Sequence, residues 1–99
     1  MSHSLSLSPA PERGSSLLEE EDREKAVTEL ERKHLVETDR HIAECKEYIA
    51  KQHELIQRAI EQGRSTEVAE TTLETLEASL RAFERQRRLL LDRLKERER

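Results

Sequence analysis

Two histidines and one cysteine near the middle of the chain have the types and spacing of metal ligands. His41 follows His34 by seven residues, and Cys45 follows His41 by four. Residues four or seven apart lie on the same face of a helix, and imidazole and thiolate groups are common zinc ligands in proteins. One hypothesis is therefore a metal-binding helical protein that uses His41, Cys45 and their neighbours.

A second metal pattern starts at Glu31. Glu31 and His34 have the Glu-x-x-His spacing of carboxylate-bridged di-iron helix bundles. Such a site also needs a carboxylate at the same level of the facing helix, where this sequence offers Leu94 instead. Phe83 is also expected to cover Cys45. We therefore expect no bound metal and no other cofactor, and we interpret these side chains as the lining of a helix pair.

Cys45 and His41 could also form a thiolate pair, because they lie one helical turn apart. The chain has no glycine-rich phosphate loop and no second cysteine, since it contains only two Gly and one Cys. A pair of helices also encloses no cavity that could hold a substrate away from water. The sequence therefore predicts that the protein is not an enzyme.

The arginine-rich end of the chain is a candidate for contact with phosphate groups. Residues 81–99 contain eight basic and four acidic residues. The whole chain, however, has a net charge of -4. Its one Phe is expected inside a helix interface, where it cannot stack on bases. Weak nucleic-acid binding by this half is a further alternative, but we do not expect a nucleic-acid partner.

The composition limits the kind of element that could position these residues. Of the 99 residues, 40% are charged and 33% are hydrophobic, with two Gly and two Pro. So few Gly and Pro argue against a loop-rich or sheet-rich protein. No apolar run approaches the ~20 residues that cross a membrane. These observations favour one small all-α domain without a membrane partner.

The first 15 residues differ from the rest of the chain. Residues 1–15 are rich in Ser and contain both prolines and a Gly, so we predict a disordered tail. The tail has neither the basic nor the apolar segment of an export signal, and a single Cys fits a reducing compartment. Both observations favour a cytoplasmic location. Ser16 and Glu19 have the spacing of a capping box, which predicts a helix that begins at about residue 17.

Residues 17–62 have the apolar period of one long helix, with a repeat every seven residues. When Leu35 is assigned to heptad position a, the a row is apolar and the d row is small or polar. Such a stripe packs against one partner helix. The a row contains Leu35, Ile42, Ile49 and Ile56, and the d row contains Thr38, Cys45, Gln52 and Ala59.

Residues 66–97 repeat the pattern in a second helix. Its a row contains Leu73, Leu80, Arg87 and Leu94, and its d row contains Ala69, Leu76, Phe83 and Leu90. Arg87 must extend into solvent or pair with a carboxylate, because an unpaired buried guanidinium is very unfavourable. Asp39 is the nearest candidate. The predicted apolar seam consists of Leu35, Ile42, Ile49, Ile56, Leu73, Leu76, Leu80, Phe83, Leu90 and Leu94.

A turn at residues 63–65 is expected to join the two helices. Gly63 can adopt the left-handed conformation that ends a helix, and Ser65 or Thr66 can cap the next one. A connection this short makes the helices antiparallel neighbours. The predicted fold is an all-α, coiled-coil-like antiparallel two-helix hairpin over residues 16–98. Facing residues then lie at similar distances in sequence from the turn.

Several apolar residues fall outside the a and d rows. Four of them form a predicted interaction face beside the seam: Leu55, Ile60, Leu89 and Leu91. A two-helix hairpin also buries little surface per residue and is marginally stable alone. We therefore expect a homodimer that forms a four-helix bundle.

The stretch from His34 to Leu94 resembles a family of short, uncharacterised helical-hairpin proteins of alphaproteobacteria. The similarity depends on Arg40-His41-Ile42-Ala43-Glu44, on Ile49-Ala50-Lys51-Gln52-His53-Glu54-Leu55-Ile56, on Gly63-Arg64-Ser65-Thr66 and on Arg87-Arg88-Leu89-Leu90-Leu91. The resemblance implies the hairpin fold and a bacterial source, and it implies no activity. The function that we predict is a non-enzymatic protein–protein interaction or oligomerisation module with an unknown partner.

Overall fold

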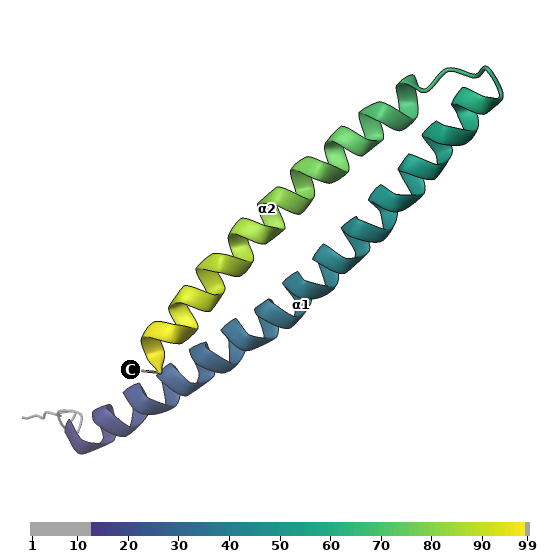
Figure 1. Cartoon of the computed structure of the whole chain (residues 1–99). Coiled ribbons are helices and arrows are strands. Elements are labelled where there is room, and N and C mark those ends of the chain that lie inside the picture. Colours follow the sequence, from purple (N-terminus) through teal and green to yellow (C-terminus); the bar gives the residue numbers. More distant parts are fainter. Residues whose placement is uncertain (1–12, 99) are drawn as a thin grey trace, which may run out of the picture.

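The protein is an all-α antiparallel hairpin, as the heptad pattern predicts (Figure 1). The computed structural model describes the backbone of residues 13–98 and the side chains of residues 19–98. Helix α1 comprises Arg13–Glu61 (49 residues) and helix α2 comprises Glu67–Arg97 (31 residues). At a rise of ~1.5 Å per residue, α1 is about 73 Å long and α2 about 46 Å.

Helix α1 begins earlier than the sequence predicts. Its first residue is Arg13, so Ser16 lies inside the helix and not at its N-cap position. No proline follows Pro11, and a glycine such as Gly14 is tolerated in a first turn, where few backbone hydrogen bonds depend on it. Residues 13–15, the last three of the predicted disordered tail, therefore belong to the helix. The other residues of the tail, 1–12, lie outside the described part of the chain.

The turn begins with a Schellman motif at Gly63. Gly63 has a φ of +66°, in the left-handed region that glycine adopts without strain. The amide of Arg64 donates to the carbonyl of Ala59 at 2.8 Å, and the amide of Gly63 donates to the carbonyl of Ile60 at 3.1 Å. The prediction that Gly63 ends the first helix is confirmed.

Thr66 is the N-cap residue of helix α2, and Ser65, the residue before it, supplies the side-chain hydrogen bond to the first turn. The amide of Glu67 donates to Ser65 Oγ at 3.3 Å, whereas the Thr66 side chain makes no capping hydrogen bond. Glu67 and Glu70 lie in the first turn, where the positive end of the helix dipole favours carboxylates. Of the two capping side chains that the sequence allowed, the chain uses that of Ser65.

The a and d rows of the sequence form the contact between the helices. From Thr28 to Ala59, every a and d residue of α1 is buried or partly buried, and His41 is the one further residue that is not exposed. On α2, Arg87 and Arg97 are exposed a and d residues. Every residue of the predicted apolar seam is buried or partly buried.

Burial is unequal along the hairpin. We call residues 28–47 with residues 81–98 the distal half, and residues 48–80 the turn-proximal half. All buried residues among those described lie in the distal half: Glu31, Thr38, Ile42, Cys45, Leu90 and Leu94. In the turn-proximal half the seam residues are only partly buried.

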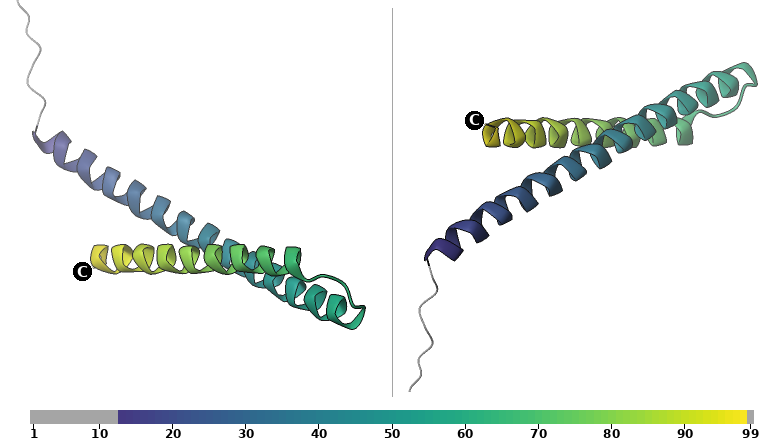
Figure 2. Two further views of the ribbon diagram at one scale, coloured as in Figure 1. Left: turned by 90° about the horizontal axis from the view of Figure 1, so that it is seen from above. Right: turned by 90° about the horizontal axis from the view of Figure 1, so that it is seen from below.

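The helices differ in length, so α1 projects beyond the end of α2. In Figure 1 the purple start of α1 continues past the yellow end of α2. Glu31 bonds to Arg97, the last residue of α2, and the two lie at equal distances in sequence from Arg64. The residues of α1 before about Thr28 therefore have no facing segment of α2. Figure 2 shows further that the two helix axes cross at an acute angle.

Candidate interaction surfaces

Among the side chains proposed as metal ligands, His41 and Glu31 have other partners in the structure. The ring of His41 stacks on that of Phe83, with centroids 5.1 Å apart and planes 15° from parallel. Cys45 is a buried free thiol. Within residues 19–98, no three His, Cys, Asp or Glu side chains lie close enough together to hold a metal ion. Phe83 was expected over Cys45, and the ring contact that the structure shows is with His41, one helical turn before Cys45.

Glu31, the carboxylate of the Glu-x-x-His pattern, is bonded to α2. Its Oε1 accepts a hydrogen bond from Nε of Arg97 at 2.6 Å, and only 10% of the Glu31 side chain is exposed. A charge-assisted bond of this length is stronger than one between neutral groups. The Glu31 carboxylate thus pairs with the positive charge of Arg97 at the end of α2.

Arg87 pairs with Asp39, the carboxylate that the sequence suggested. Nε of Arg87 lies 2.7 Å from Oδ1 of Asp39, and both side chains are about half exposed. A longer ion pair joins Arg32 and Glu98 at 3.9 Å. Among the described residues, the ion pairs between α1 and α2 all belong to the distal half. Part of the basic excess of the α2 end is therefore neutralised within the hairpin.

The heptad frame gives the hairpin two different sides. In an antiparallel pair, position e of one helix borders position e of the other, and the Arg32–Glu98 ion pair joins two e residues. We call this side the charged flank. Its rows are Arg32, Asp39, Lys46, His53 and Ile60 on α1, with Glu70, Glu77, Glu84, Leu91 and Glu98 on α2.

The opposite side, which we call the neutral flank, is bordered by position g of both helices. Its rows are His34, His41, Tyr48, Leu55 and Gln62 on α1, with Thr72, Ser79, Gln86 and Arg93 on α2. Position c lies next to g on the outer side of each helix. Seven of the ten charged-flank residues carry a formal charge, against one of the nine neutral-flank residues. The two sides therefore offer partners very different chemistry.

An open groove lies on each flank. The groove on the neutral flank is near the turn, has a volume of about 630 Å³ and includes Leu55, Ala59, Val68 and Ala69 in its lining. The short side chains of Ala59 and Ala69 leave this space between the helices. The groove on the charged flank, of about 500 Å³, is lined mostly by charged residues: Asp39, Lys46, Glu84, Arg87 and Arg88.

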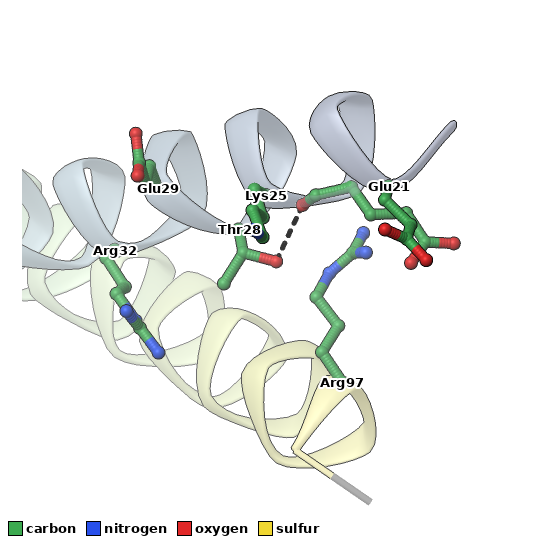
Figure 3. A pocket seen from close by; sticks show the side chains of 7 residues that line it. Glu21, Lys25, Thr28, Glu29, Arg32 and Arg97 are labelled. Carbon is green, nitrogen blue, oxygen red and sulfur yellow. Dashed lines mark hydrogen bonds between the residues drawn. The ribbon is translucent and has the colours of Figure 1, made fainter. Parts of the chain in front are cut away.

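A third groove, of about 520 Å³, lies where α2 ends against α1. Figure 3 shows Arg97 reaching from the end of α2 toward α1, beside Glu21, with Lys25 and Arg32 nearby. The hydroxyl of Thr28 donates to the carbonyl of Glu24 at 2.8 Å. The lining mixes both signs of charge and is open to solvent.

The four residues of the predicted interaction face lie on two sides of the hairpin. Leu55 at position g and Leu89 at position c are 48% and 57% exposed on the neutral side. Ile60 and Leu91 at position e lie on the charged flank, where Ile60 is exposed and Leu91 partly buried. The four residues therefore do not form one continuous surface.

Four exposed apolar residues of the neutral side do not belong to the predicted interaction face: Val27, Leu30, Tyr48 and Val68. Tyr48 at position g is 50% exposed and Val68 at position c is 80% exposed. The signal was present in the g row from Val27 to Gln62, which contains no charged residue at neutral pH. The g residues of the two helices form one surface because the g rows of an antiparallel pair lie on the same side of the hairpin.

Comparisons with protein-family models, with curated proteins and with solved structures gave no match to this chain. Neither described helix combines the length and the apolarity needed to cross a membrane.

Proposed function

We propose that the chain is a non-enzymatic helical interaction module that assembles with a second copy of itself into a four-helix bundle. The observation that supports this is the thinness of the core. None of the large side chains among the described residues is fully buried, and Tyr48, Leu55, Ile60, Val68 and Leu89 are exposed. Since each helix of a lone hairpin has only one neighbour, a second hairpin is the simplest way to cover the rest.

Sedimentation equilibrium of the full chain tests the proposal. At micromolar concentration we expect a mass of twice 11.6 kDa. We also expect the midpoint of thermal unfolding to rise with protein concentration, because association stabilises the folded state by mass action. A mass of 11.6 kDa at every concentration, with full helicity retained, would contradict the proposal.

The proposal includes a reducing location such as the cytoplasm and a bacterial source. Cys45 is a free thiol that packs inside the seam, which fits a compartment where thiols stay reduced. The bacterial source comes from the resemblance of residues 34–94 to short alphaproteobacterial hairpin proteins. Fractionation of cells that express the chain with its native ends, followed by thiol labelling under denaturing conditions, checks the location. Recovery outside the cytoplasm or with an oxidised Cys45 would contradict it.

A further inference from the structure

We infer that the second copy binds across the neutral flank, with the turns of the two hairpins at opposite ends of the dimer. This inference rests on the proposed self-association and specifies its surface and orientation. Three observations support it: the lack of charge on this flank, the exposed apolar residues along it, and a change in sign of the charges at its rim.

The neutral flank can be buried without leaving charges in an apolar contact. Arg93 is its one residue with a formal charge, and it lies near the end of α2. The threonines of this side also satisfy their own hydroxyls. Thr72 Oγ1 donates to the carbonyl of Val68 at 2.9 Å, and Thr75 Oγ1 donates to the carbonyl of Thr71 at 3.1 Å. Their polar atoms therefore do not require water when the face is covered.

Exposed apolar residues follow the neutral flank over most of its length. On α1 they are Val27, Leu30, Tyr48 and Leu55, and on α2 they are Val68 and Leu89, all at positions g or c. An apolar stripe at a and d that extends to g is typical of helices that face a bundle core, whereas a and d alone suffice for a two-helix contact. The stripe thus predicts a second layer of helices on this side.

The rim of this flank favours another copy of the same chain in one orientation. Position c of α1 reads Glu37, Glu44, Lys51 and Arg58, so the charge changes from negative to positive along the helix. When two copies pack with their α1 helices antiparallel, Glu37 faces Arg58 of the other copy and Glu44 faces its Lys51. A surface of this kind is complementary to itself under a two-fold rotation.

Tyr48 lies near the centre of this arrangement. It occupies the g position between Glu44 and Lys51, and Nζ of Lys51 is 5.8 Å from the centre of its ring. The two-fold axis therefore passes close to Tyr48, and the Tyr48 side chains of the two copies meet there. At the same level of α2 the residues are small, Ser79 and Ala82, which allows the second pair of helices to approach closely.

The charged flank offers no equivalent surface. Its α2 row begins with Glu70, Glu77 and Glu84. Two copies packed through this flank in the same orientation would place these carboxylates against one another, because α2 would face α2. Like charges at that distance disfavour association.

Charge reversal at the rim tests the orientation in the full chain. Glu37→Lys and Arg58→Glu should each weaken the dimer about tenfold, because each reversal makes two symmetric ion pairs repulsive. The double variant should regain most of the affinity. Lys46→Glu, an exposed reversal on the charged flank, is the matched control and should leave the dimer constant within about twofold. Failure of the double variant to recover affinity would overturn the antiparallel orientation.

Disulfide cross-linking tests the position of the axis. In a Cys45→Ala background, Tyr48→Cys places a single thiol beside its symmetry mate, and His53→Cys places one on the charged flank as the control. We expect rapid covalent dimers from Tyr48→Cys and few from His53→Cys. Equal rates, or faster cross-linking of His53→Cys, would overturn the inferred surface even if the protein is a dimer. A monomeric wild-type chain would instead overturn the proposed function. If either cysteine variant loses helicity, the charge-reversal series decides.

Discussion

The two halves of the hairpin share one heptad pattern but pack differently. The distal half contains all the buried residues of the described chain and the ion pairs that join its two helices. In the turn-proximal half the same a and d positions are only partly buried. The heptad pattern therefore determines which residues face the partner helix, and the size of those residues determines how well the interface closes.

Small side chains account for the loose packing nearest the turn. The turn-proximal seam includes Gln52, Ala59 and Ala69, whereas the distal seam brings Phe83, Leu90 and Leu94 of α2 against α1. Small residues at facing positions leave the groove that Leu55 and Val68 line. We interpret the distal half as the part that stabilises the hairpin, and the turn-proximal half as the part with more surface left for a partner.

The largest predicted effect comes from comparing one leucine truncation in the distal half with one in the turn-proximal half. Leu90→Ala in the distal half should lower the free energy of unfolding by about 2–5 kcal/mol, because it removes a buried side chain and leaves a cavity. Leu76→Ala, the same change at a partly buried d position of the turn-proximal half, should lower it by about 1–2 kcal/mol. Urea unfolding followed by circular dichroism, at one protein concentration, measures both. Equal losses would mean that the two halves contribute equally to stability.

The second prediction concerns the ion pair at the distal end. Glu31→Ala should lower the free energy of unfolding by about 1–3 kcal/mol, because Arg97 loses the charge-assisted hydrogen bond that it makes with the buried Glu31 carboxylate. The Arg97 side chain is 35% exposed and can partly turn to water, so the upper end of this range is not expected. Glu47→Ala, an exposed glutamate on the outer face of α1, is the control. If Glu31→Ala lowers the free energy of unfolding no more than Glu47→Ala does, the ion pair does not stabilise the distal half. Burial of the seam alone would then distinguish the distal half from the turn-proximal half.

The third prediction concerns the end of the turn-proximal half. Gly63→Ala should lower the free energy of unfolding by about 1 kcal/mol, because an L-residue is strained in the left-handed region. No atom lies within 4 Å of the added Cβ, so the loss comes from the backbone conformation and not from a clash. Arg64→Ala is the control at the neighbouring position. An unchanged unfolding midpoint for Gly63→Ala would show that the loosely packed half rearranges its turn without loss.

The sequence predicted those features that depend on local chemistry or on helical period. Gly63 had to end the first helix because no other residue near it adopts a positive φ readily. Arg87 at an a position had to extend into solvent or pair with a carboxylate, and it pairs with Asp39, the nearest candidate on the facing helix. The hairpin fold followed from the short turn between two heptad stretches.

Other features depend on three-dimensional contacts that the period does not specify. The ring of Phe83 stacks on that of His41, a contact that the sequence did not predict, because a heptad assignment gives the row of a side chain but not where its ring comes to lie. The capping motif at Ser16 predicts too late a start for α1, because the chain after Pro11 has no proline to prevent helix formation from Arg13 onward. Leu55 and Ile60 were assigned to one surface, although positions g and e lie on opposite sides of the seam.

The smallest predicted effect tests whether ion pairs or apolar contacts distinguish the distal half. A double-mutant cycle of Asp39→Ala and Arg87→Ala should give a coupling energy of about 0.2–1 kcal/mol, the range of solvent-exposed ion pairs. The 2.7 Å bond has good geometry, but the two side chains are 49% and 44% exposed, so water competes for both groups. Because ions screen exposed charges, the coupling should fall as salt is raised, while the loss caused by Leu90→Ala should not. A coupling that exceeds the effect of Leu90→Ala would reverse the order argued above. It would make polar pairing, and not the size of the seam residues, the reason why the distal half packs more tightly.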